Sequence, residues 1–184
     1  MEYLARLASA DPTPGGGSAA TIVAALGASL VAMAARITAA NPKHAPKRDD
    51  AERLVARADA LRAELATAQT RDEAAFTAVI ASRGDARQQA LAHAAAEPLN
   101  AMRLSVEVQR LAAEALSLEN PHLASDIGCA AEFAAAAVAA CAYNVRVNHR
   151  AMRDSALVAT QAVEMERYER ESATLLRRVR ETVR

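Results

Sequence analysis

The residue best suited to chemistry in this sequence is Asp72, an acid placed among apolar side chains. Apolar residues recur around it at intervals of four and three, the spacing of one helix face: Leu54, Ala58, Leu61, Leu65, Ala68, Phe76 and Val79. Asp72 occupies the step of this face between Ala68 and Phe76. A carboxylate on a buried face costs free energy unless it is paired, hydrogen-bonded or protonated. Asp72 is therefore a candidate for proton transfer near neutral pH, and the alternative is a salt bridge to a neighbouring helix.

A second candidate is the stretch DPTPGGGS at residues 11–18, which precedes an uncharged run that ends at Ala35. Two prolines prevent a helix from starting earlier, whereas Gly15, Gly16 and Gly17 allow backbone angles that other residues avoid. We expect Ser18 to cap the helix that follows. Backbone N–H groups at such a helix start, with the positive end of the helix dipole behind them, can bind an anion. The alternative is a tight cap that only lets this helix pack closely.

Two further polar candidates, Asp126 and Asn144, share one face of a helix that we expect to open at residues 120–121. They are eighteen residues apart, which is five complete turns, so they point in the same direction at a separation of roughly 27 Å. They cannot hold one small group together. Either they contact opposite ends of an extended ligand, or they serve different sites or subunits. Structural roles are also open: Asp126 can stabilise the helix dipole, and Asn144 can bond a neighbouring helix.

The elements that must position these residues are all predicted to be helices. The periodicity predicts helices over residues 1–10, 18–39, 49–81, 86–117, from 120 onward, and 154–183. A proline-containing loop at residues 41–48 and a turn at 82–85 separate three of them, and Pro98 predicts a kink. No strand-like alternation and no internal repeat occur. We therefore predict one domain over residues 1–184 with an all-α fold, an up-and-down bundle of about five to six long antiparallel helices.

Composition argues against several classes of function. Lys plus Arg and Asp plus Glu number 22 each, so nothing global favours nucleic acid, and we expect no such partner. Cys129 and Cys141 form no Cys-x-x-Cys motif, and no histidine stands at metal-ligand spacing. We expect no metal site and two buried thiols in a reducing cytosol. The N-terminus is no signal peptide, and the run to Ala35 is rich in Ala, Gly, Ser and Thr, so we expect a cytoplasmic protein without a membrane partner.

The same composition predicts self-association. Hydrophobic residues make up 52% of the chain but aromatic residues only 3%, so the core must be built largely of Ala, Leu and Val. Contacts between alanines bury little area, and a monomer stabilised by them alone is expected to be marginal. We therefore expect a homo-oligomer.

Several motifs, taken in order, resemble one known family. PTPGGGSAA at residues 12–20, continued by ALGA at 25–28 and by Met33, resembles the signature of the formiminotransferase-cyclodeaminase C-terminal domain. That family also includes stand-alone methenyltetrahydrofolate cyclohydrolases. Later stretches match in the same order: DEAAF at 72–76, EPL at 97–99, SDIG at 125–128 and NVRVN at 144–148. PGGGS alone would be a weak signal, but the ordered series spans most of the chain and is specific.

The resemblance implies an all-α, dimer-forming fold and folate one-carbon chemistry at an amidine-type carbon. In one reaction of the family, 5-formiminotetrahydrofolate closes to the 5,10-methenyl form and loses ammonia. In the other, water opens the methenyl bridge to give 10-formyltetrahydrofolate. Neither reaction needs a metal or a redox cofactor, so we expect no cofactor beyond the folate substrate and a homodimer as the assembly.

The resemblance also implies roles for particular residues. Asp72 is the expected catalytic acid–base group. Substrate binding is assigned to Gly15, Gly16, Gly17, Ser18, Lys43, Lys47, Asp126 and Asn144. The two lysines are expected to meet the glutamate tail of the folate. The family carries a lysine run after Leu-Thr, of which only Lys43 is in register here, and Lys47 supplies charge nearby.

Two alternatives to an enzyme remain open at this point. A non-catalytic interaction or folate-binding module on the same fold is suggested by the thinned lysine run and by the shortened turn at residues 82–86. The retained Asp72, Asp126 and Asn144 favour the enzyme. A helical membrane protein is the third possibility. Turnover of a folate substrate would indicate the enzyme, and folate binding without turnover would indicate the module. A membrane protein would not stay soluble without detergent.

Overall fold

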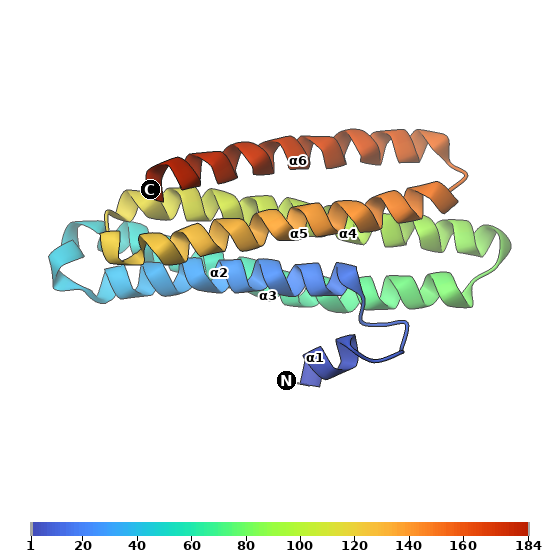
Figure 1. Cartoon of the computed structure of the whole chain (residues 1–184), viewed down its shortest axis with the longest axis horizontal. Helices are drawn as coiled ribbons and strands as arrows, with labels where there is room; N and C mark the ends of the chain where they lie inside the picture. The colour runs from blue at the N-terminus through green and yellow to red at the C-terminus, as the bar shows by residue number, and fades with distance from the viewer. Residues whose placement is uncertain (1, 184) are drawn as a thin grey trace.

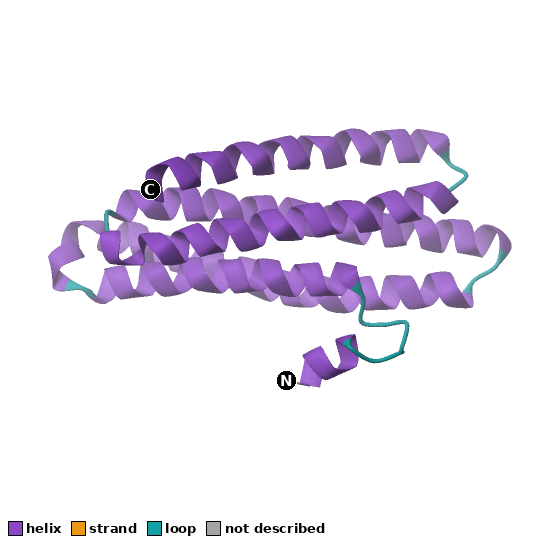
Figure 2. Cartoon of the chain, in the orientation of Figure 1, coloured by secondary structure: helices purple, strands orange, loops and turns teal. Residues whose placement is uncertain are grey.

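Long helices that run alongside one another form the bundle (Figure 1), and the computed structural model describes residues 2–183. No strand occurs among these residues (Figure 2). The α-helices are α1 (Glu2–Leu7), α2 (Gly16–Ala40), α3 (Arg48–Ala81), α4 (Gly84–Ala115), α5 (Ala124–Ala151) and α6 (Ser155–Val183). Short 3-10 helices connect them: η1 (Pro42–Lys47), η2 (Leu116–Leu118) and η3 (Pro121–Leu123). Successive helices from α2 to α6 reverse direction, so the predicted up-and-down all-α bundle is confirmed (Figure 1).

The start of α2 differs from the prediction in one respect. The helix begins at Gly16, and Gly15 is its N-cap, in an extended conformation without a side-chain cap. Ser18 lies inside the first turn, and its hydroxyl pairs with the Tyr3 hydroxyl at 2.7 Å. The predicted cap at Ser18 is therefore wrong, because the helix includes Gly16 and Gly17. The backbone N–H groups of this first turn are left for other partners.

The break after α2 is more ordered than the predicted loop. Asn41 accepts a hydrogen bond from the Lys43 backbone at 3.0 Å and caps η1, with Pro42 at the first helical position, where proline is tolerated. At the next break, only Ser82 and Arg83 separate α3 from α4. Gly84 starts α4 with a positive φ of 55°, a conformation that other residues rarely adopt.

Small residues let the central helices approach closely. The buried residues of α2 include Ala20, Ala24, Ala28 and Ala32, which recur at every fourth position. A Cβ atom built on Gly27 would lie 2.9 Å from the Ala130 carbonyl oxygen of α5. Only glycine allows this approach of α2 to α5.

Two predictions of burial are wrong. Phe76 is 43% exposed, and Ala75 takes its place on the buried face of α3. After Asp72 the face continues at a step of three rather than four, which a 3.6-residue period equally allows. Cys129 is exposed, whereas Cys141 is buried as predicted.

Two stretches are long and apolar enough to cross a membrane, α2 and Pro121–Ala151. In α2, 56% of the most apolar 18-residue segment is buried inside the bundle. In Pro121–Ala151, the buried share of the corresponding segment is 39%. Core helices of a soluble bundle pass the same test of length and composition, and both stretches contribute to the core here.

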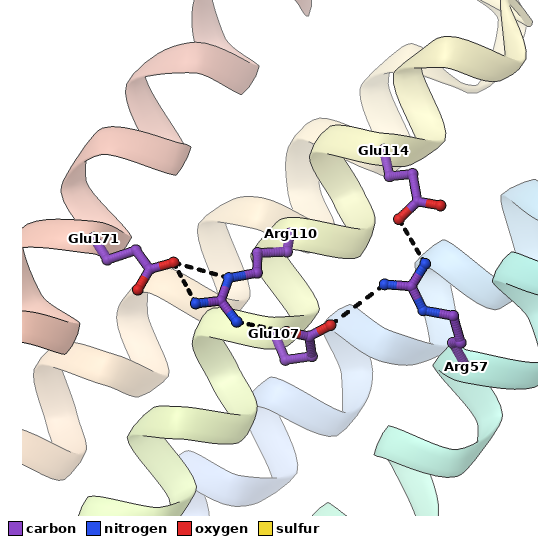
Figure 3. Close-up of polar contacts among 5 residues, drawn as sticks. All are labelled: Arg57, Glu107, Arg110, Glu114 and Glu171. Atoms are coloured by element: carbon purple, nitrogen blue, oxygen red, sulfur yellow. Dashed lines mark hydrogen bonds and ion pairs between the residues drawn. The ribbon is translucent and has the colours of Figure 1, made fainter.

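Charged residues tie three helices together on the surface (Figure 3). Arg57 of α3 pairs with Glu114 at 2.7 Å and with Glu107 at 3.4 Å, both on α4. Arg110 links Glu107 to Glu171 of α6. Exposed pairs of this kind contribute roughly 0–1 kcal/mol each, so the network supports the packing of the apolar faces rather than replacing it.

Candidate active site

A cavity of about 180 Å³ lies where the turn before α2 meets α3, α4 and α5. The turn contributes one wall, the C-terminal third of α3 a second, and the C-terminal half of α5 a third. The lining residues are Pro12, Thr13, Gly15, Gly16, Gly17, Asp72, Glu73, Phe76, Ala94, Asn144 and Asn148. The structure thus brings the glycine turn, Asp72 and Asn144 together around one space.

Asp72 lies directly against the glycine turn. A Cβ atom built on Gly17 would lie 2.5 Å from Oδ1 and 2.6 Å from Oδ2 of the Asp72 carboxyl. Any other residue at this position would therefore displace the carboxyl. A Cβ on Gly16 would lie 3.8 Å from the amide nitrogen of Asn144. The glycines are needed so that the turn can approach both side chains, an explanation that does not depend on unusual backbone angles.

The pKa of Asp72 is raised from 3.8 to about 6. Burial is the largest cause, because it disfavours the charged carboxylate. The nearby negative charge of Glu97 raises the pKa further, and Glu73 adds a smaller effect in the same direction. A hydrogen bond from the Ser18 backbone opposes both. Asp72 can therefore hold or release a proton close to neutral pH.

Glu97 is a buried carboxylate that pairs with Arg71, the residue before Asp72. It follows Ala94 of the cavity wall by one helical step and has a side chain that is 10% exposed. Its Oε2 lies 2.9 Å from Nε of Arg71. His93 stands 3.8 Å from the other oxygen and is largely exposed. Glu97 thus belongs to the electrostatic environment of Asp72.

The short helix α1 attaches to the rim of the cavity through polar side chains. The Tyr3 hydroxyl contacts Ser18 in the first turn of α2. Arg6 donates to Glu73 at 2.9 Å, and Gln69 donates to the other oxygen of Glu73 at 2.5 Å. The described residues of α1 are not buried, and α1 stands apart from the bundle in Figure 1. These contacts hold the glycine turn and the acidic rim in place.

Ser18 is fully buried and does not line this cavity, and three other predicted binding residues lie away from it. Asp126 is in the first turn of α5, eighteen residues before Asn144, and does not line the cavity. Lys43 and Lys47 lie in η1, beyond the far end of α2 from the glycine turn (Figure 1). The 25 residues of α2 span roughly 37 Å. Lys47 also pairs with Glu119 at 3.1 Å. One subunit therefore does not bring Asp126, Lys43 and Lys47 together with Asp72, and their roles stay predictions.

Sequence reasoning missed several residues of the cavity. Glu73 and Phe76 follow Asp72 on α3 within the DEAAF stretch, but the predicted burial of Phe76 concealed its position at the rim. Ala94 carries no chemical signal in the sequence. Asn148 belongs to the recognised NVRVN stretch, and its helical spacing of four from Asn144 is the signal that could have placed both on one wall.

The arrangement can carry out proton transfer on a bound ligand. It combines a carboxyl of near-neutral pKa with the start of a helix that has no side-chain cap, where a polar or anionic group is favoured. Among residues 2–183, no group of three or more His, Cys, Asp or Glu side chains is placed to hold a metal. Burial and the charge of Asp72 raise the pKa of the Cys141 thiol to about 12, so this cysteine is no nucleophile at neutral pH.

Known proteins match this chain in sequence and in fold over almost its whole length. The formiminotransferase-cyclodeaminase family model matches residues 1–167. A methenyltetrahydrofolate cyclohydrolase of Methylorubrum extorquens is 33% identical over 195 aligned positions, which cover 99% of this chain and 94% of that protein. The crystal structure of a formiminotetrahydrofolate cyclodeaminase from Thermotoga maritima is 26% identical, with a TM-score of 0.95, over 99% of this chain and 93% of that one. The chain belongs to the formiminotransferase-cyclodeaminase family.

Proposed function

We propose that this protein is an enzyme of folate one-carbon metabolism that acts on the carbon–nitrogen bonds of a tetrahydrofolate derivative. The observation that carries the proposal is the contact between the Asp72 carboxyl and Gly17 at the wall of the cavity. The names of the two relatives, a cyclohydrolase and a cyclodeaminase, support the substrate class. Such a substrate also fits the cytoplasmic location expected from the sequence.

The glycine turn and α5 supply the proposed binding contacts. Gly15, Gly16 and Gly17 offer backbone N–H groups to the pterin or to a carboxylate, since α2 starts here without a side-chain cap. The buried Ser18 instead donates its backbone N–H to Asp72 and so helps to position that carboxyl. Asn144 faces the same space from α5. No cofactor is needed, because the bridging carbon of the substrate is already electrophilic.

Asp72 is the proposed proton-transfer group. In the hydrolytic reaction, a water oxygen attacks the carbon that bridges N5 and N10, and Asp72 takes one proton of that water. The bond from the carbon to N5 then breaks, and N5 receives a proton from Asp72. The remaining hydroxyl proton leaves as the formyl carbonyl forms. A carboxyl with a pKa of about 6 suits both halves of this transfer at neutral pH.

The choice between cyclohydrolase and cyclodeaminase activity is settled by parallel assays of one preparation. Purified protein is given 5,10-methenyltetrahydrofolate or 5-formiminotetrahydrofolate, and absorbance of the methenyl bridge is followed together with release of ammonia. Blanks without protein correct for spontaneous opening of the bridge. Loss of the methenyl signal identifies a cyclohydrolase, and formation of it with ammonia identifies a cyclodeaminase. Folate binding without turnover of either substrate would contradict the proposal and favour a binding module.

We also propose that the protein acts as a homodimer through α2 and α5. These helices pack against each other and leave large apolar side chains exposed: Leu26, Met33 and Ile37 on α2, and Phe133, Tyr143 and Val147 on α5. A second copy fits this face because a two-fold interface joins a surface to itself. An antiparallel partner would bring its η1 toward the glycine turn. Lys43 and Lys47 would then meet the glutamate tail from the partner subunit.

A further inference from the structure

Pro98 creates a free acceptor in the cavity wall. It lies inside α4 without ending that helix. Since proline has no backbone N–H, the carbonyl of Ala94, four residues earlier, loses its usual helical donor. Ala94 is buried and lines the cavity, so this carbonyl needs another partner.

Asn148 of α5 is that partner. Its Nδ2 donates to the Ala94 carbonyl at 2.9 Å and to the Asn144 carbonyl at 3.0 Å. Both partners are acceptors, so the amide nitrogen must face them, and both of its hydrogens are used. The orientation of the side chain is therefore fixed by two main-chain contacts on two helices.

The amide oxygen of Asn148 is left available. No residue among 2–183 donates a hydrogen bond to Oδ1, and this atom is not among the buried polar atoms that lack a partner. Asn148 itself lines the cavity. A rigid acceptor therefore stands on the α5 wall, while the glycine turn offers donors from another wall.

We propose that Asn148 is a substrate-binding residue whose amide oxygen accepts a hydrogen bond from a ring N–H or amino group of the pterin, and that Pro98 is its positioning residue. This assignment rests on the proposed function. A tetrahydropterin carries several N–H donors, and a donor left unpaired in a closed site lowers affinity. The competing explanation is that Asn148 only ties α5 to α4.

The first test replaces Asn148 with leucine, which has a similar size but no acceptor. Calorimetric titration with tetrahydrofolate, which lacks the one-carbon bridge, measures affinity without requiring turnover. We expect N148L to weaken binding roughly tenfold and to raise KM more than it lowers kcat. The control is N120L, since Asn120 is also buried and bonds Thr38 of another helix but does not line the cavity. It should lower stability and leave affinity unchanged.

The second test replaces Pro98 with alanine, which restores an N–H for the Ala94 carbonyl and releases the Asn148 amide. We expect P98A to weaken binding two- to fivefold without loss of stability, because alanine favours a helix interior. If Pro98 acts through Asn148, P98A has no further effect on affinity in the N148L background.

The outcomes separate this assignment from the proposed function. A wild-type protein that binds no tetrahydrofolate overturns both. A folded N148L protein with wild-type affinity overturns the assignment alone and leaves Asn148 as a structural tie. Should N148L not fold, P98A decides: an affinity equal to that of the wild type overturns the assignment, and a weakened one supports it.

Discussion

Asp72 is held in an environment that disfavours its own charge. Burial and the charge of Glu97 both raise its pKa, and the protein therefore keeps a carboxyl that carries a proton at a higher pH than an unfolded chain would. By linkage, such a group lowers stability as the pH rises from 3.8 to about 6, where the unfolded chain loses this proton more readily than the folded protein. The proposed function and the stability of the fold are therefore in conflict at this residue.

Replacing Asp72 with asparagine is expected to stabilise the protein above pH 6. The difference between a pKa of 3.8 and one of about 6 corresponds to roughly 3 kcal/mol, and partial solvent contact reduces this to about 1–2 kcal/mol. The gain should shrink as the pH falls from 6 to 4, because the carboxyl then becomes protonated in the unfolded chain as well, and should vanish below 4. Urea unfolding of both proteins from pH 4 to 8 measures it. A gain independent of pH would contradict the raised pKa.

Removing the charge of Glu97 is expected to lower the pKa of Asp72 from about 6 toward its ordinary value. Carboxyl resonances of 13C-labelled aspartate report this in E97Q without any substrate, with D72N identifying the signal. E114Q is the matched control, since Glu114 also pairs with an arginine, Arg57 of α3. Glu114 lies on α4 as Glu97 does, but seventeen residues or roughly 26 Å farther along that helix. An unchanged titration of Asp72 in E97Q would show that Glu97 does not act on it.

Part of the site could be predicted at the level of single residues. Asp72 stood out because a carboxylate interrupts an apolar face, and the structure places it in the cavity wall. Asn148 could not be distinguished from a structural asparagine, because its role depends on Ala94, which is 54 residues away along the chain. Only the register of α4 against α5 brings these two residues together.

At the level of helices, periodicity predicted both position and ends closely for two of the long helices. The predicted helix over residues 154–183 is Ser155–Val183, and that over 49–81 is Arg48–Ala81. The predicted N-cap at Ser18 is wrong because serine often caps helices, whereas here the helix already includes Gly16 and Gly17. The predicted burial of Phe76 is wrong because steps of three and of four residues are equally compatible with one helix face, and the structure buries Ala75 instead.

The close approach of α2 and α5 predicts opposite effects for two glycines in helices. Gly27→Ala is expected to cost about 1–3 kcal/mol, because its Cβ would lie 2.9 Å from the Ala130 carbonyl oxygen. Gly128→Ala should be neutral or stabilising by up to about 1 kcal/mol, since its Cβ would meet only Val183 at 3.4 Å and alanine favours the helix. Urea unfolding of both variants measures the difference. Equal stability of the two would contradict the packing of these helices.

At the level of the whole molecule, the exposed apolar face of α2 and α5 predicts self-association. Leu26 is 51% exposed and Met33 is 37% exposed on α2. Glutamate at both positions would place two charges in the proposed interface, so the double variant should be a monomer when the wild type is a dimer. Light scattering after size exclusion gives the mass. A63E, at an exposed position on α3, should remain a dimer, and a monomeric wild type would contradict the proposed face.

Asp72, as the proposed group that moves protons at the bridging carbon of the substrate, is central to the proposed function. The most direct measurement is turnover of 5,10-methenyltetrahydrofolate and 5-formiminotetrahydrofolate by the wild type and by D72N, from pH 5 to 8, against blanks without protein. The wild type should turn over one of the two substrates, with an ionisation near pH 6 in kcat/KM. D72N should fold, bind tetrahydrofolate and lose at least about a hundredfold in kcat. A D72N protein as active as the wild type would contradict the account.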